Sequence, residues 1–173
     1  RISENHYHMT TTTAQAANVL SHLEYYLQIV WPELNVNVVS TTEQWAGAAI
    51  AGPKSRKVLQ KLFPDLNVSN EGLPFMGYKE GNLCGIHARI FRISFSGELA
   101  YEVNVESDNG NFMWEKIMEN GKEFNIEAYG TEALSTLRIE MGHVAGSELD
   151  GRTIPYDNSL EGLVSKKKDF IGK

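Results

Sequence analysis

Arg92-Ile-Ser-Phe-Ser-Gly97-Glu98-Leu-Ala-Tyr101-Glu102 predicts two strands joined by a tight turn at the glycine. Side chains alternate along a strand, so every second residue from Tyr101 to Val105 shares one apolar face. Glu102 lies on the other face. An isolated acid on a strand usually faces water. A carboxylate held on a rigid strand can also bind a planar ligand that offers two adjacent N–H donors. Both interpretations of Glu102 stay open at this point.

The composition is that of an ordinary soluble globular protein, with 42% hydrophobic and 22% charged residues. A net charge of −6 argues against nucleic acid as a partner. The single cysteine, Cys84, excludes an internal disulfide framework, and its apolar surroundings predict a small core residue. No apolar run reaches the roughly 20 residues that span a membrane. We therefore expect a cytoplasmic protein without a membrane segment. Because the chain starts at Arg1, we expect a piece of a longer polypeptide.

Hydrophobic periodicity and turn residues predict alternating helices and strands. We expect helices at 14–31, 53–63, 109–120 and 131–141, and strands at 6–13, 36–40, 45–51, 84–95 and 98–105. A Gly-, Pro- and Asn-rich connection at 65–81 predicts two lobes, 1–72 and 73–173. Strands paired by hairpins and alternating with helices indicate an α+β fold with antiparallel sheets. Two ferredoxin-like split β-α-β units fit this order.

Few residues outside the hairpin suggest chemistry. The chain has neither a G-x-G-x-x-G fingerprint nor a P-loop. His6 and His8 share a strand face but have no third metal ligand nearby. Arg138 lies at the margin of the buried stripe of its helix, where a guanidinium needs an acceptor. An internal ion pair and recognition of a ligand carboxylate or carbonyl are equally open for it.

Three motifs together resemble a known family. Arg92–Glu102 is similar to the pattern R-x-S-F/Y-S/T-G-E-x-G/A-Y-E, Ala133–Gly142 to A-L-x-x-L-R-x-E-x-G, and Asp169–Lys173 to D-F-I-G-K. On these motifs the chain is identified as a member of the aminomethyltransferase family, which has the fold of the glycine-cleavage T protein. His8–Thr13 and Trp31–Arg56 further resemble the branch formed by sarcosine oxidase alpha subunits. The resemblance covers essentially the whole chain.

This resemblance implies a tetrahydrofolate-binding module. By this resemblance Glu102 binds the pteridine edge, and Arg138 binds acceptor groups elsewhere on folate. Phe95 packs beside the ligand, at a position where relatives often carry Tyr. The implied reaction is the capture by tetrahydrofolate of a one-carbon unit from oxidised sarcosine, giving 5,10-methylenetetrahydrofolate. FAD, FMN and NAD are expected only in other parts of the parent enzyme. The other sarcosine oxidase subunits are the expected partners.

The chain departs from the family pattern at its ends. Family members carry an acidic residue just before the strand that corresponds to Ile2–Thr13, and this residue falls before Arg1. No catalytic residue is therefore assigned within the chain. A C-terminal β-barrel is expected after Lys173, so the fold is truncated at both ends, and we expect the isolated segment to be inactive. A dimethylglycine dehydrogenase, a glycine-cleavage T protein and a non-catalytic folate-binding or subunit-docking module are the alternatives.

Overall fold

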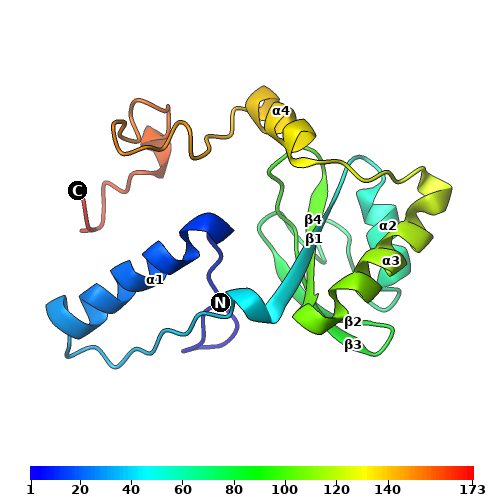
Figure 1. Cartoon of the computed structure of the whole chain (residues 1–173), viewed down its shortest axis with the longest axis horizontal. Helices are drawn as coiled ribbons and strands as arrows, with labels where there is room; N and C mark the ends of the chain where they lie inside the picture. The colour runs from blue at the N-terminus through cyan, green and yellow to red at the C-terminus, as the bar shows by residue number, and fades with distance from the viewer.

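A four-stranded antiparallel sheet is the centre of the computed structural model, which describes residues 1–173 (Figure 1). The strands are β1 (Trp45–Ala51), β2 (Tyr78–Leu83), β3 (Ile86–Phe91) and β4 (Ala100–Glu106), arranged in the order β1-β4-β3-β2. β4 is paired on both sides, with Glu102 opposite Ala49 of β1 and Phe91 of β3. The predicted pairing of the strands before and after Gly97 is therefore confirmed, but the connection is the loop 92–99 and not a tight turn, and Arg92–Phe95 lies outside β3.

Four α-helices accompany the sheet: α1 (Ala16–Tyr25), α2 (Ser55–Leu62), α3 (Gly110–Gly121) and α4 (Thr131–Met141). A π-helical turn, Tyr26–Val30, extends α1. The helix ends there because Pro32 follows shortly after it and proline cannot continue a helix. α2 and α3 cover one face of the sheet, whereas α1 and the C-terminal segment lie on the side of the other face (Figure 1). None of the helices combines the length and apolarity needed to cross a membrane.

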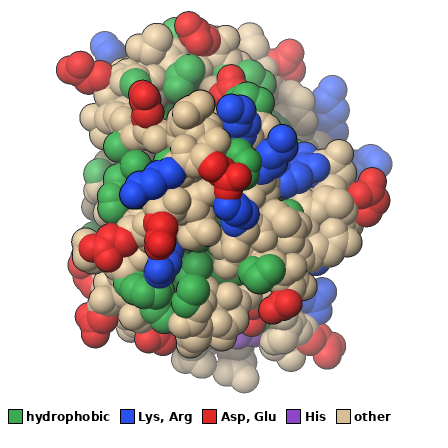
Figure 2. All heavy atoms as spheres, turned by 90° about the vertical axis from the view of Figure 1, so that its right-hand side faces the viewer, with side chains coloured by type: hydrophobic (Ala, Val, Ile, Leu, Met, Phe, Trp, Pro, Cys, Tyr) green, Lys and Arg blue, Asp and Glu red, His purple; other side chains and the backbone are tan.

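The hydrophobic core lies between the sheet and the pair α2 and α3. Tyr101, Val103 and Val105 of β4 are fully buried in it, as their alternation predicts. All buried residues fall between Ile50 and Gly121, and neither α1 nor α4 contains one. Figure 2 shows the outer face on the side of α2 and α3, where Lys and Arg side chains gather among acidic ones. This layer therefore has a buried apolar side and a charged solvent side.

The structure confirms most of the predicted elements, and the bounds of α4 match the prediction. One difference concerns Cys84, which is exposed and not part of the core. Cys84 and Gly85 both have positive φ, 52° and 96°, and form the tight turn between β2 and β3. The strand expected at 84–95 is therefore confirmed only over β3, because this turn precedes it and the loop 92–99 follows it. β2 overlaps the stretch 65–81, which was expected to be a connection without a strand. The strands expected at 6–13 and 36–40 are also absent, since no neighbouring strand pairs with these segments.

The order of elements also differs from two split β-α-β units. The α+β class and the antiparallel pairing are confirmed. However, β3 and β4 are joined by the loop 92–99 without a helix, so only α2 lies between two strands of the sheet. The strands on either side of α2, β1 and β2, lie at opposite edges. The sheet thus takes β1 from residues 1–72 and three strands from residues 73–173, and the two-lobe division stays a prediction.

Candidate functional site

A cavity of about 390 Å³ lies against the face of the sheet that α2 and α3 leave uncovered. This size falls within the range of about 300–1,000 Å³ typical of small-molecule sites. Its sheet side is formed by Trp45 and Gly47 of β1, Arg89 and Phe91 of β3, and Glu102 and Asn104 of β4. The opposite side comes from residues of 8–13, from one side of α1 and from residues of 38–42. The cavity thus joins the central strands to the N-terminal segment.

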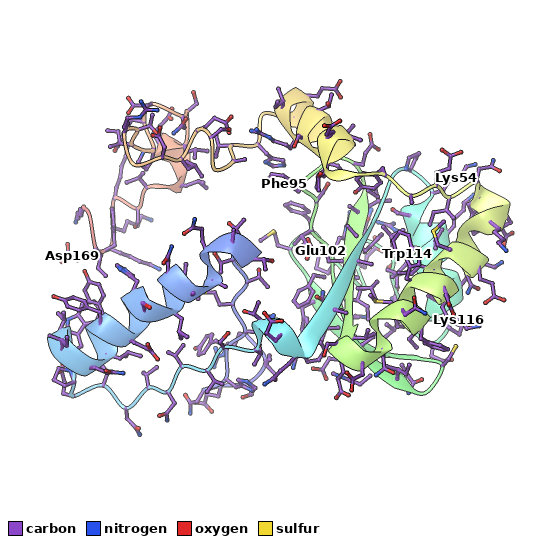
Figure 3. The ribbon with its side chains drawn as sticks, in the orientation of Figure 1. Lys54, Phe95, Glu102, Trp114, Lys116 and Asp169 are labelled. Carbon is purple, nitrogen blue, oxygen red and sulfur yellow. The ribbon has the colours of Figure 1, made fainter.

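Glu102 is the acidic group of this cavity. It is half-buried on β4, and Figure 3 shows it on the side of the sheet that faces α1, away from Trp114 of α3. No protein group donates a hydrogen bond to its carboxylate, and no cation forms an ion pair with it. Removal from water raises the pKa of Glu102 above its ordinary value. The cavity therefore presents an unpaired acceptor.

The backbone of β1 makes room beside Glu102. Gly47 lies opposite Asn104, and a Cβ atom on Gly47 would stand only 2.8 Å from Oδ1 of Asn104. Glycine at this position lets the amide of Asn104 lie across the sheet. Gly47 on β1 thus leaves room at the floor of the cavity.

Aromatic rings line the cavity beside the carboxylate. The rings of Phe91 and His8 stack at 5.8 Å between centroids with an interplanar angle of 25°. Burial, together with the charge of Arg89, lowers the pKa of His8, so its imidazole is neutral at pH 7. Trp45 completes the aromatic surface from β1. Flat apolar surfaces next to one charged acceptor suit a planar heterocycle with polar edges.

Phe95 and Arg138 lie outside this cavity. Phe95, on the loop 92–99, stacks on His143 at 5.7 Å with an interplanar angle of 11°, and it remains 44% exposed (Figure 3). Arg138 of α4 donates to both carboxylate oxygens of Glu148, at 2.7 and 3.3 Å, and to the carbonyl of His143 at 3.1 Å. The structure thus brings these two residues together around His143, and not with Glu102. Their contact with folate stays a prediction.

Arg89 is a cavity residue that the sequence analysis did not single out. The only sequence signal was its position in strand alternation, where it follows Ala88 and precedes Ile90, both fully buried. A cation between two core residues must lie on the opposite face, which here is the cavity face. Nothing local to β3 indicated that β4 would place Glu102 and Asn104 on the same face of the sheet. The chain has no group of three His, Cys, Asp or Glu residues that could hold a metal ion.

Comparison with known proteins supports a family assignment. Over the whole of this chain, identity is 48% with sarcosine oxidase subunit alpha of Rhizobium meliloti (strain 1021) and 49% with that of Corynebacterium sp. (strain P-1). The chain spans 18% of the length of each of these proteins. Mitochondrial dimethylglycine dehydrogenase of Mus musculus is 36% identical over 142 residues, which are 80% of this chain and 16% of that protein.

A family profile gives the broader relationship. The GCVT N-terminal domain matches residues 1–168, which is nearly the whole chain. An aminomethyltransferase of Chloroherpeton thalassium is 31% identical over the full chain, which covers 46% of that protein. The resemblance carried by the hairpin and α4 motifs is confirmed. The chain therefore belongs to the family of the GCVT N-terminal domain.

Proposed function

We propose that this chain binds tetrahydrofolate in the cavity at Glu102. The observation that supports it is a half-buried carboxylate without a protein partner, facing a cavity with aromatic walls. The pteridine ring is planar and carries an N–H and an exocyclic amino group side by side. Two such donors match the two oxygens of an ionised carboxylate. Binding would therefore satisfy an acceptor that the folded protein leaves unpaired.

The family and the similarity to sarcosine oxidase alpha subunits support a role in one-carbon transfer. Tetrahydrofolate supplies the nitrogen atoms that accept the one-carbon unit. In this proposal the protein acquires the unit from oxidised sarcosine, yields 5,10-methylenetetrahydrofolate and works with further sarcosine oxidase subunits in the cytoplasm. Glu102 orients the pteridine, and its negative charge favours positive charge developing on the ligand. Any FAD, FMN or NAD chemistry belongs to other parts of such an enzyme.

A folate-binding or subunit-docking module without catalysis is the second candidate. It is favoured by the positions of Phe95 and Arg138, which contact His143 and Glu148 and leave the cavity to Glu102. Folate binding alone does not separate the two candidates. Transfer of a one-carbon unit from formaldehyde to tetrahydrofolate, measured in a whole enzyme that contains this segment and lost in its Glu102→Gln variant, supports the first.

Titration calorimetry with tetrahydrofolate under reducing conditions tests binding. Glu102→Gln keeps the shape of the side chain but removes a charged acceptor that contributes about 1.5–3 kcal/mol in a hydrogen bond. We expect its affinity to fall at least tenfold. Glu106→Gln is the matched control, because Glu106 lies on the same face of β4 but is exposed and does not line the cavity. Equal affinities of the wild type and Glu102→Gln would contradict the proposal, as would no binding to the wild type at millimolar ligand.

A further inference from the structure

A second hollow lies beside α2 and shares no lining residue with the cavity of Glu102. Its volume is about 610 Å³. Three parts of the chain line it: α2, the segment that follows α2, and both ends of the loop 92–99. Its charged and amide side chains are Arg56, Lys57, Gln60, Asn70 and Arg92. The α2 hollow is therefore lined by cations and amides, and no acid lines it.

Neutral acceptors fix the orientation of Arg56 in the α2 hollow. Its Nε donates to the hydroxyl of Tyr101 at 2.8 Å, and its Nη2 donates to Oδ1 of Asn70 at 2.6 Å. Tyr101 is fully buried, so this side of the guanidinium is anchored on the core. Nη1 has no acceptor in the protein. The planar guanidinium is thus held in one orientation, with donors left for an anion.

Arg92 and Lys57 also keep free donors. Arg92 donates from Nη1 to the carbonyl of Leu73 at 3.0 Å, which leaves its Nη2 without an acceptor. Lys57 is exposed on α2 and has no partner within the protein. None of the three cations that line the α2 hollow forms an ion pair.

The protein places little negative charge beside these cations. Glu71 lies within the field of Arg56, but no ion pair joins the two side chains. The pKa of Glu71 is lowered mainly by hydrogen bonds from its own backbone and from Ser69, and least by Arg56. The whole chain carries a charge of −6, so the positive charge is local to the α2 hollow. Like charges that converge in this way repel one another, and a bound anion would relieve the repulsion.

We propose that the α2 hollow binds the phosphate group of a small molecule. Two guanidinium groups and one ammonium group match the double negative charge and the several oxygens of a phosphate. A surface for nucleic acid or an acidic protein would extend as a longer basic stripe. Here the cations line one hollow of small-molecule size. This site goes beyond the proposed function, because it needs neither folate nor any residue of the folate cavity.

NMR titration of the chain with pyrophosphate, in a buffer free of phosphate, tests the site. The Nε–H signals of Arg56 and Arg92 should shift together, with a single dissociation constant. Lys57→Gln should weaken pyrophosphate binding roughly threefold, because it removes one exposed charge. Arg92→Gln should weaken it about tenfold, because it removes a charge-assisted hydrogen bond. Neither variant should change the affinity for tetrahydrofolate.

Lys61→Gln is the matched control. Lys61 lies one turn beyond Lys57 on α2, pairs with Glu123 and does not line the α2 hollow. Its replacement should leave the affinity for pyrophosphate unchanged. Lys57→Gln also guards against a failure to fold, because Lys57 makes no contact whose loss would unfold the chain. Arg56→Gln lacks this advantage, since it would leave the buried hydroxyl of Tyr101 without its partner.

Several results would overturn the inference. One is the absence of a shift in the arginine signals at millimolar pyrophosphate. Another is an equal loss of affinity in Lys57→Gln and Lys61→Gln, which would report only the overall charge of the chain. Tri-L-glutamate is the carboxylate probe, and tighter binding of this peptide than of pyrophosphate would replace the phosphate ligand by an acidic peptide. The folate proposal is judged separately, by the effect of Glu102→Gln on tetrahydrofolate.

Discussion

Glu102 costs the folded protein stability in the absence of ligand. Burial raises its pKa above the ordinary value of 4.5, so the folded state holds this proton more tightly than the unfolded chain does. The contribution of Glu102 to the free energy of unfolding is therefore most favourable below pH 4.5, and stability is lost as the pH rises through the folded-state pKa. Binding sites commonly carry such a cost, because a preformed site leaves groups unsatisfied until the ligand arrives.

Replacing Glu102 by Gln tests this cost. Glu102→Gln should raise the free energy of unfolding at pH 7, because the amide does not titrate and avoids the penalty that burial places on the charged carboxyl group. The gain should shrink toward zero at pH 4 and below. Urea denaturation at the two pH values measures it. Glu106→Gln, on the exposed end of β4, should show no such pH dependence. A Glu102→Gln variant less stable than the wild type at pH 7 would contradict the prediction.

Glu148 behaves in the opposite way. Hydrogen bonds from Arg138, Ser147 and the backbone of Ala145 lower its pKa to about 2. Its stabilising contribution is therefore complete above pH 4.5 and is lost as the pH falls toward 2. The side chain of Arg138 is only 11% exposed, so removing its acceptor leaves a poorly solvated cation.

Glu148→Gln should therefore lower stability at pH 7. The urea midpoints of Glu148→Gln and the wild type should converge as the pH approaches 2. Glu140→Gln is the control, because Glu140 is exposed on α4 and has no ion pair. If the difference between Glu148→Gln and wild type persists unchanged at pH 2, the ion pair is not its source.

At the scale of secondary-structure elements, the loop 92–99 contacts the end of α4 at Gly97. Gly97 has φ of +82°, and a Cβ atom there would stand 2.8 Å from Cγ and Sδ of Met141, the last residue of α4. The glycine thus satisfies two requirements at once: a left-handed backbone and close approach of a helix end. This contact connects the hairpin motif to the α4 motif.

Gly97→Ala should lower the free energy of unfolding by roughly 1–2 kcal/mol from the left-handed backbone alone. Displacement of Met141 adds to this loss. Met141→Ala, combined with Gly97→Ala, should relieve the displacement but not the backbone strain, so the double variant should lose less than the sum of the two single variants. Urea denaturation of the four proteins gives the coupling. Strict additivity would show that Met141 does not respond to residue 97.

Across the whole molecule, burial is concentrated in residues 50–121. α1 and α4 are held outside this core, with large exposed side chains such as Tyr25 of α1 and Met141 of α4. Segments without buried residues open at low free energy. The wall of the cavity formed by α1 is therefore the part most able to respond to a ligand.

Hydrogen exchange should show this difference. We expect strong protection of the amides in β1, β3 and β4 and weak protection in α1. Tetrahydrofolate should increase protection in α1, because helix residues such as Val19, Leu20 and Leu23 line the cavity. α4 does not line the cavity and is the internal reference. Protection that rises equally in α1 and α4 would indicate general stabilisation and not contact with the ligand.

Short-range chemistry in the sequence was enough to predict several features. The alternation in Tyr101–Glu106 predicted which face of β4 packs in the core. Pro32 predicted where the first helix ends, and the apolar stripe of α4 predicted the bounds of that helix. Each depends on residues close together in the chain, so the pattern carries the information. The turn at Cys84 was missed because left-handed φ at a cysteine has no strong local signal.

The composition of the site required the path of the whole chain. Trp45 and Arg89 meet across β4 only because the sheet order places β1 and β3 on either side of it. The chain after α4 folds back. Arg138 therefore forms its ion pair with Glu148, and the ring of Phe95 stacks on that of His143. Sequence alone thus predicted the pairing of β3 with β4, the helices and the face of β4 on which Glu102 lies. Its neighbours depend on strand order and loop path, and these follow from the packing of segments far apart in the sequence.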